Sequence, residues 1–283
     1  MLGSTLTKYL TPCVNEVVEF NRSGIPIVTG NKALAFDAIL SNPIREYLEK
    51  ERFDFVINAI GIIKQLMDEK DKDVVETAYL VNSSLPRELS SYAKVNPTEI
   101  IQIGTDCVYS GREGDYSEAS KFDCEDLYGL SKVSGEAESK SLMTIRSSII
   151  GHEIKQPVSL MDWFLTQQTS ATVKGYTNHL WNGVTTLAFA RVIRGIIHHN
   201  AFEEGTLHLV PRDQISKFDL LRHLAEQFGR TDIKVNEFET EFGVDRTLVT
   251  LFPEKNYRLW LNAGYTQVPS IAELIEEYAE WSS

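Results

Sequence analysis

The chain has 283 residues and a formal net charge of -12, with 40 acidic residues against 28 lysines and arginines. This length suits one large domain or a domain with a smaller lobe, and a hydrophobic content of 42% is ordinary for a globular protein with a buried core. The acidic balance argues against nucleic acid as a partner, because duplex binding needs a basic footprint. It leaves room for a phosphate-bearing small molecule, which backbone amides at a helix N-terminus can bind.

The cysteines and apolar segments indicate the compartment. Cys13, Cys107 and Cys124 show no metal-ligand spacing, so we predict no metal site. Three isolated cysteines fit a reducing compartment better than a disulfide framework. No apolar run approaches the roughly 20 residues that a membrane span requires, and the N-terminus lacks the layout of a signal peptide. We therefore expect a cytoplasmic protein with no membrane partner.

Strand and helix patterns alternate along most of the chain. Helical spacing covers residues 4–10, 44–51 and 73–94, and Pro86 in the last range predicts a kink or a new start. Short apolar or β-branched runs predict strands over residues 25–29, 53–59, 99–103, 142–150 and 205–210. This rhythm predicts an α/β fold with a doubly wound parallel sheet and helices on both faces.

The C-terminal part has a different pattern. Two amphipathic helical stretches, 215–228 and 271–281, flank a polar region that we expect to be irregular. We interpret this part as a smaller C-terminal α/β lobe over the mouth of the sheet. The predicted division is a domain over 1–150, to which 183–210 returns, and a lobe built from 151–182 and 211–283. Ligands of open α/β sheets bind beyond the carboxyl ends of the strands, so the lobe is expected to contact substrate.

The strongest chemical signal is the pair Tyr128 and Lys132, four positions apart on a predicted helix. That spacing puts both side chains on one face. A lysine cation beside a phenol lowers the pKa of the phenol, which can then give its proton to a carbonyl oxygen as hydride arrives at the carbon. Thr105 ends a predicted strand about twenty residues earlier, where its hydroxyl can bond the same oxygen or simply cap a turn.

Small residues mark two further places where a cofactor could approach the backbone. The strand that ends at Asn58 runs into Ala59, Ile60 and Gly61, and Gly3 comes at the start of the first helical run. Together with the other motifs these segments carry a family resemblance. It rests on the order Asn58-Ala-x-Gly, Thr105-Asp-x-Val-Tyr-x-Gly, Tyr128-Gly-x-Ser-Lys132-x-x-Gly-Glu136 and Ile145-Arg146-Ser147-Ser148.

That order resembles the extended short-chain dehydrogenases/reductases, and most of all the dTDP-4-dehydrorhamnose reductase group. The resemblance implies a Rossmann-type domain that binds NADP(H) or NAD(H), with Thr105, Tyr128 and Lys132 as the catalytic set. Tyr128 would be the general acid, Lys132 would lower its pKa and hold the nicotinamide ribose, and Thr105 would orient the carbonyl. The cofactor would supply the hydride.

The resemblance also implies binding residues. The expected cofactor contacts are Leu2, Gly3, Phe36, Asp37, Asn58, Ala59, Ile60, Gly61, Asn82 and Lys132. The expected substrate contacts are Thr105, Asp106, Val108, Tyr128 and Lys64. Arg146 fits either a diphosphate contact or a buried structural ion pair.

The residues after Thr105 separate reaction types within this superfamily. Dehydratases that resemble this chain carry an Asp-Glu pair there, and this chain has Asp106-Cys107, so dehydration is disfavoured. The favoured function is reduction of the keto group of a nucleotide-linked 4-keto-6-deoxy sugar. The alternatives are an epimerase of the same fold and a non-catalytic regulatory subunit that binds the sugar nucleotide or the cofactor. Dimers are common in the family, and the sequence leaves the oligomeric state open, with a homodimer as one of the options.

The N-terminus departs from the family pattern. The family begins with a strand and a glycine-rich turn, and here Met1-Leu2-Gly3 matches only the last glycine of that turn. The first strand and the start of the glycine motif are therefore expected to be missing, either because the recorded chain starts at an internal methionine or because the protein is a natural variant. Lys32, after the strand expected over 25–29, favours NADP(H) as cofactor, with NAD(H) as the alternative.

Overall fold

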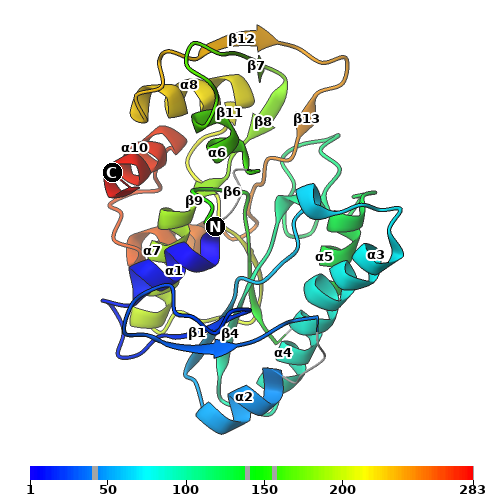
Figure 1. Cartoon of the computed structure of the whole chain (residues 1–283), viewed down its shortest axis with the longest axis vertical. Coiled ribbons are helices and arrows are strands. Elements are labelled where there is room, and N and C mark those ends of the chain that lie inside the picture. The colour runs from blue at the N-terminus through cyan, green and yellow to red at the C-terminus, as the bar shows by residue number, and fades with distance from the viewer. Residues whose placement is uncertain (40–43, 138–140, 155–157, 283) are drawn as a thin grey trace.

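The computed structural model describes residues 1–39, 44–137, 141–154 and 158–282. Its centre is a parallel sheet whose strand order is β10-β5-β4-β3 (Figure 1). The strands are Phe55–Asn58 (β3), Glu99–Ile103 (β4), Met143–Arg146 (β5) and Gly205–His208 (β10). The sequence patterns located all four, and the prediction of an α/β fold with a parallel sheet is confirmed.

Two earlier strands form a separate parallel pair, Val18–Asn21 (β1) with Lys32–Ala35 (β2). The prediction of a strand over 25–29 is wrong. The Asn21 side chain accepts hydrogen bonds from the backbone amides of Ser23 at 3.1 Å and Gly24 at 2.9 Å, and Gly24 adopts a φ of 65°. This turn leaves Ile25 68% exposed, so the short apolar run belongs to a loop.

Helices cover the sheet on both sides (Figure 1). They include Leu2–Leu10 (α1), Ile44–Glu51 (α2), Lys72–Tyr79 (α3), Leu85–Ala93 (α4), Leu127–Ala137 (α5) and Thr186–His198 (α7). The helix expected over 73–94 is interrupted by a π-helical turn, Leu80–Ser84 (η2), and Pro86 lies in the first turn of α4. Among the described helices, none is long and apolar enough to cross a membrane.

The main core lies between the sheet, α1, α7 and a further helix, Pro253–Asn262 (α9). Leu2, Leu6 and Leu10 form the buried stripe of α1. The expectation of an irregular region between 228 and 271 is wrong for α9, because Pro253 opens this helix at its first turn, where a missing N–H costs nothing. The spacing of α7 and α9 is close, since a Cβ added at Gly195 would lie 2.7 Å from the backbone of Asn262.

The smaller α/β lobe predicted for the C-terminal part is present (Figure 1). One of its sheets has the order β11-β8-β13, and another pairs β12 with β7. Its strands are Thr172–Tyr176 (β7), His179–Trp181 (β8), Ile215–Ser216 (β11), Lys234–Phe238 (β12) and Val244–Asp245 (β13). Its helices are Leu160–Leu165 (α6), Lys217–Gln227 (α8) and Ile271–Ser282 (α10). Two short strands, Ile149–Ile150 (β6) and Val184–Thr185 (β9), pair where the lobe meets the main sheet.

A buried polar network holds α5 on the sheet. Arg146 at the end of β5 forms an ion pair with Glu136 of α5, and their side chains are only 2% and 7% exposed. Arg146 also donates to the Tyr109 hydroxyl at 2.9 Å and to Nε2 of His208 at 2.7 Å. Of the two roles left open for Arg146, the structure therefore shows the structural ion pair.

We expect Arg146→Met to destabilise the fold by about 3–5 kcal/mol, because it leaves the Glu136 carboxylate buried without its cation. Chemical denaturation followed by circular dichroism measures the loss. The double variant Arg146→Met with Glu136→Leu removes both charges and should recover part of it. A loss below about 1 kcal/mol in the single variant would show that the pair does not hold the helix.

The same network predicts loss of stability in acid. Burial, and next the Arg146 charge, lower the pKa of His208 to about 4, whereas an unfolded histidine titrates near 6.5. Between these values only the unfolded chain takes up the proton, so the free energy of unfolding decreases as pH falls, by up to about 3 kcal/mol. Hydrogen bonds that outweigh burial lower the pKa of Glu118. Protonation of this carboxylate on further acidification therefore also decreases the free energy of unfolding.

Urea denaturation at pH 7 and at pH 5 measures this dependence. His208→Gln should show a flatter decrease in unfolding free energy over that interval than the parent chain. His199→Gln, which changes an exposed histidine, is the matched control and should keep the slope of the parent. Equal slopes for His208→Gln and the parent would contradict the assignment to His208.

Candidate active site

Tyr128 and Lys132 lie one turn apart on α5, at the carboxyl end of the main sheet. The start of α5 is fixed by two carboxylates. Asp126 accepts from the backbone amide of Gly129 at 2.9 Å, and Glu69 accepts from that of Leu127 at 3.0 Å. These contacts satisfy amides that a helix leaves unpaired in its first turn, so they fix the position of the start of α5.

Thr105 caps the short turn Asp106–Val108 (η3) that follows β4. Its hydroxyl accepts a hydrogen bond from the Cys107 amide at 3.2 Å. The same hydroxyl faces the Tyr128 phenol, and its hydrogen bond there lowers the pKa of Tyr128. Burial is the larger effect and raises the pKa of Tyr128. The charge of Lys132 does not offset the effect of burial, so the decrease in the Tyr128 pKa that was expected from the lysine is not found. The phenol is therefore protonated at neutral pH, as a proton donor must be.

Lys132 is 8% exposed and makes no hydrogen bond or ion pair with any residue that the structure describes. Burial lowers its pKa, and the nearby Glu136 charge raises it. A Cβ added at Gly61 would lie 3.4 Å from the Lys132 ammonium. Gly61 has no side chain, so space remains in front of the Lys132 ammonium. This ammonium can still donate hydrogen bonds to a ligand.

Two buried asparagines shape the loop after β3. Asn82, 1% exposed on η2, accepts from the amide of Ile62 at 3.0 Å and donates to its carbonyl at 3.1 Å. Asn58 accepts from the amide of Ile60 at 3.2 Å and donates to the Gln102 side chain at 2.7 Å. Both side chains are thus occupied in fixing the backbone around Gly61, which is the part left to meet a ligand.

The other expected cofactor residues lie in two places. A Cβ added at Gly3 would be 3.8 Å from Ala59, so the start of α1 does meet the end of β3. Leu2 and Phe36 are each 6% exposed and pack in the hydrophobic cores. The Asp37 carboxylate accepts from the backbone amide of Ile39 at 3.0 Å.

The expected substrate residues divide in a similar way. Asp106 is 9% exposed beside Thr105, whereas Val108 is fully buried in a cluster with Tyr109 and Tyr116. The Lys64 ammonium pairs with the Asp126 carboxylate at 2.9 Å. The structure thus places Asp106 beside Thr105, whereas Val108 packs in the core and Lys64 binds the carboxylate at the start of α5.

Cys107 is near Tyr128 and is a neutral thiol. Burial and the Asp106 charge raise the pKa of Cys107 to about 12. A thiol that stays protonated at neutral pH cannot act as the base that a glutamate provides at this place. The geometry therefore agrees with the sequence argument against dehydration.

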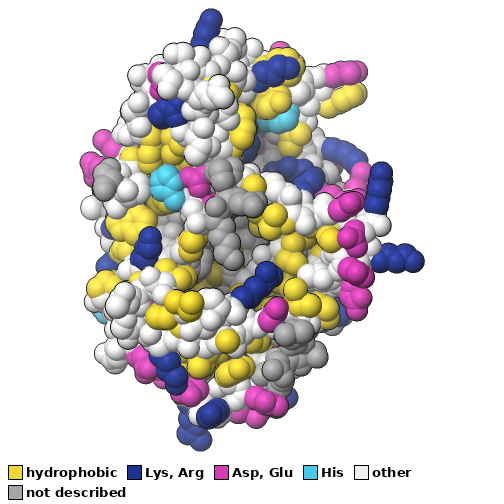
Figure 2. All heavy atoms as spheres, viewed as in Figure 1, with side chains coloured by type: hydrophobic (Ala, Val, Ile, Leu, Met, Phe, Trp, Pro, Cys, Tyr) yellow, Lys and Arg dark blue, Asp and Glu magenta, His cyan; other side chains and the backbone are white. Residues whose placement is uncertain are grey.

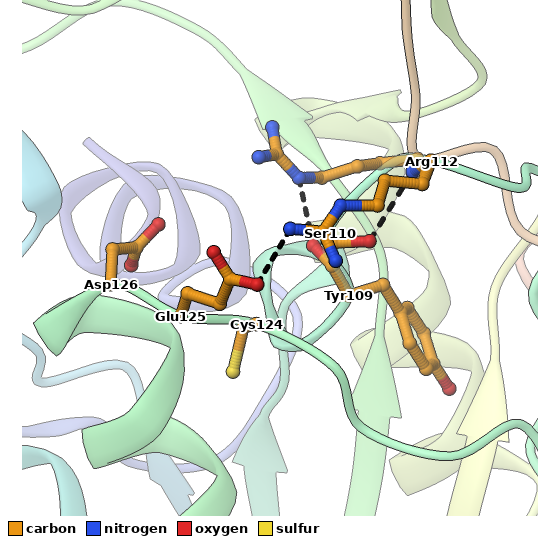
Figure 3. A pocket seen from close by; sticks show the side chains of 7 residues that line it. Tyr109, Ser110, Arg112, Cys124, Glu125 and Asp126 are labelled. Atoms are coloured by element: carbon orange, nitrogen blue, oxygen red, sulfur yellow. Dashed lines mark hydrogen bonds and ion pairs between the residues drawn. The ribbon is translucent and has the colours of Figure 1, made fainter.

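A cavity of about 270 Å³ opens beside the start of α5 (Figure 3). Its wall combines residues of the loop after β4, the segment before α5 and the residue that follows β13 of the lobe: Tyr109, Ser110, Arg112, Cys124, Glu125, Asp126 and Arg246. Arg112 reaches across to Glu125 at 2.6 Å, and Nε of Arg246 donates to the Tyr109 carbonyl at 2.9 Å. Sequence reasoning missed Arg246, because nothing local in the sequence connects it with this site.

The corrected strand positions change which cation follows a strand end. The strand before Lys32 is β1 and not residues 25–29, and Lys32 is the first residue of β2, where it pairs with Glu51 at 2.8 Å. The residue that follows the carboxyl end of β1 is Arg22, which is exposed and forms no ion pair within the described parts of the chain. A correct placement of the strand would have identified it from the sequence.

Known proteins share the sequence pattern and the fold of this chain. The family model described as the RmlD substrate binding domain matches residues 1–245, and no curated protein matches the sequence. A hypothetical dTDP-4-dehydrorhamnose reductase from Sulfolobus tokodaii has a similar structure, with a TM-score of 0.71 and 23% identity over 87% of this chain and 88% of the other.

Two further solved structures show the same fold. The dTDP-4-dehydrorhamnose reductase of Bacillus anthracis in complex with NADP has a TM-score of 0.69 and 17% identity over 95% of this chain and 99% of that one. MoeE5, in complex with UDP-glucuronic acid and NAD, has a TM-score of 0.74 and 16% identity over 99% of this chain and 95% of that one. The family match covers most of the sequence, and the fold agrees with it throughout. The chain belongs to the RmlD-like family of extended short-chain dehydrogenases/reductases, which are NAD(P)-dependent oxidoreductases.

Proposed function

We propose that this protein reduces the keto group of a nucleotide-linked 4-keto-6-deoxy sugar with a nicotinamide cofactor. The observation that carries the proposal is the arrangement at the end of the sheet. A protonated Tyr128 faces Thr105, and the buried Lys132 has no partner among the described residues. This is the set of groups that transfer of a proton to a carbonyl oxygen requires.

Each residue has a separate task in this reaction. Thr105 donates a hydrogen bond that orients the substrate carbonyl, and Tyr128 gives its phenolic proton to the carbonyl oxygen. The bound cofactor supplies the hydride. Lys132 binds ribose hydroxyls in the open space before Gly61, and its positive charge stabilises the phenolate that remains after proton transfer. Cys107 stays a neutral thiol, so this chain offers no second carboxylate for removal of water.

The relatives support the substrate class. MoeE5 binds UDP-glucuronic acid or UDP-glucose, and the Bacillus anthracis reductase binds NADP. We propose that residues 1–150 and 183–210 hold the cofactor, and that 151–182 and 211–283 hold the sugar nucleotide. The reaction would take place in the cytoplasm, as a step in the synthesis of a surface polysaccharide or of an antibiotic sugar.

Replacing Tyr128 tests the reaction. Tyr128→Phe removes the donated proton but keeps the ring, and it should lower kcat for NADPH oxidation about 10²–10⁴-fold with a panel of 4-keto-6-deoxy sugar nucleotides. Tyr257→Phe, which alters a tyrosine 44% exposed on α9, should retain the parent rate. A Tyr128→Phe chain that reduces its substrate as fast as the parent would sink the proposal.

The choice of cofactor depends on Arg22 in our proposal. β1 follows the first helix of the chain, as the second strand of a Rossmann domain does. A guanidinium at the carboxyl end of that strand accommodates the 2′-phosphate of NADPH, so we propose that NADP(H) is preferred over NAD(H). Arg22→Ala should weaken NADPH binding at least about tenfold and leave NADH binding nearly unchanged. Lys32→Ala is the matched control, because its ammonium is paired with Glu51.

Titrations followed by cofactor fluorescence give both affinities. If Lys32→Ala shifts the ratio of NADPH to NADH affinity and Arg22→Ala does not, the assignment to Arg22 is wrong. Lys32 would then be the residue that favours NADP(H).

A further inference from the structure

Two buried charged side chains of α5 each keep a polar atom without a partner in the described ranges. Lys132 and Glu136 are four positions apart on this helix, so they are neighbours on one face. One carboxylate oxygen of Glu136, Oε2, pairs with Arg146, and the other, Oε1, is buried and accepts no hydrogen bond from the described residues. The Lys132 ammonium has no such partner either. Buried polar atoms are usually paired, so this free acceptor and this free donor call for an explanation.

Two glycines give these groups their places at the end of the sheet. A Cβ added at Gly104, the residue after β4, would lie 3.2 Å from Oε1 of Glu136. A Cβ added at Gly61, in the loop after β3, would lie 3.4 Å from the Lys132 ammonium. β3 and β4 are parallel neighbours in the sheet, so their carboxyl ends meet at one edge. The free carboxylate oxygen and the ammonium therefore both lie at this edge.

The Glu136 carboxylate opposes the effect of burial on Lys132. Burial lowers the pKa of Lys132, and the Glu136 charge raises it. The third group that acts on the lysine is Cys107, whose own pKa burial raises to about 12, so this thiol carries no charge at neutral pH. An ammonium enclosed by protein keeps its proton only when a nearby anion offsets the loss of water around it. Glu136 provides that anion.

The other charged groups packed around this part of α5 are occupied or exposed. Asp106 of η3 accepts from the Thr105 hydroxyl at 3.3 Å, and Arg87 of α4 donates to a backbone carbonyl of α5 at 3.1 Å. On α3 the carboxylates of Asp73 and Glu76 are exposed. Figure 2 shows acidic side chains at the surface on the edge of the molecule where α3 lies in Figure 1. Solvent and salt screen charges in such positions.

We propose that Glu136 is a positioning residue, whose carboxylate keeps Lys132 charged and ready to bind the nicotinamide ribose. This inference rests on the proposed function, because there Lys132 is the residue that holds the ribose. Glu136 then has two tasks. Its pair with Arg146 uses Oε2 and holds α5 on the sheet, whereas Oε1 has no competing hydrogen bond in the described chain and leaves negative charge available to the lysine.

Competitive labelling of lysines measures the charge of Lys132 without any ligand. Acetic anhydride acetylates neutral amines, so trace labelling at pH 8 followed by mass spectrometry reports the neutral fraction of each lysine. Glu136→Gln keeps the shape of the side chain and an acceptor for Arg146 and removes the charge. Relative to the exposed Lys234, the internal reference, Lys132 should be labelled at least about tenfold faster in Glu136→Gln than in the parent, because its counter-charge is lost.

Arg146→Met is the matched control, because it breaks the same buried pair and leaves the carboxylate in place. If Glu136 acts only by holding the fold, both single variants label Lys132 faster. If it acts on the lysine, only Glu136→Gln does so. Glu76→Gln, which changes an exposed carboxylate of α3, should match the parent. The double variant Arg146→Met with Glu136→Leu contains no unpaired charge of this pair, and it replaces Glu136→Gln should that chain not fold.

Cofactor titrations between pH 7 and pH 9 give a second readout. Glu136→Gln should lose at least about threefold more NADPH affinity over this interval than the parent, because its Lys132 gives up the proton at lower pH. In a Lys132→Met background, Glu136→Gln should add nothing to the pH dependence, since the lysine through which it acts is absent. Thermal melts by circular dichroism confirm that each variant is folded before it is labelled or titrated.

Three results would overturn the proposal. They are labelling of Lys132 in Glu136→Gln at the parent rate, equally fast labelling in Arg146→Met, and an additional loss of affinity that persists in the Lys132→Met background. The labelling result stands by itself for a chain that binds no cofactor.

Failure of this inference and failure of the proposed reaction give different results. Faster labelling of Lys132 in Glu136→Gln, with a parent that never oxidises NADPH in the presence of keto-sugar nucleotides, keeps the role of Glu136 and loses the reductase proposal. A parent that reduces a keto-sugar nucleotide, with labelling of Lys132 unchanged in Glu136→Gln, keeps the reaction and loses the role of Glu136.

Discussion

The buried ion pair between Arg146 and Glu136 is the contact on which the site depends. It joins the end of a central strand to the helix that carries Tyr128 and Lys132, and Arg146 extends it to Tyr109 and His208. A pair this deep is costly to desolvate, and further hydrogen bonds offset part of that cost. Because these bonds go to the end of the turn after β4 and to β10, the network links α5 to two strands at once.

On the opposite side of α5 the constraint is steric. A Cβ added at Gly135 would lie 2.3 Å from the carbonyl oxygen of Asn82, so only glycine allows α5 to approach the π-helical turn this closely. That approach brings the Asn82 side chain within reach of Ser131 at 3.0 Å and of the loop beyond β3. The same packing that orders the loop around Gly61 therefore also sets the distance from this loop to Lys132.

Burial determines which side chains of the site are protonated. The Tyr128 phenol and the Cys107 thiol both hold their protons, since enclosure raises the pKa of each. Burial also lowers the pKa of Lys132, whose ammonium forms no ion pair with a residue in the described ranges.

The sequence by itself determined the elements whose signals are local. Short apolar runs located the four central strands, and the segments that hold Thr105, Tyr128 and Lys132 form a strand end, a turn and a helix as expected. The family model matches residues 1–245. The local signals failed in one early segment. The apolar run at 25–29 is a loop because the Asn21 turn and Gly24 decide it.

Tertiary structure decided everything that depends on residues far apart in the sequence. Arg146 could have bound a ligand or an internal carboxylate, and only the packing of α5 on β5 selects Glu136. Arg246 stands in a polar segment of the sequence, and only the fold brings it to the cavity beside the start of α5. Sequence patterns report which face of an element is apolar, and they carry no information on which distant element that face will meet.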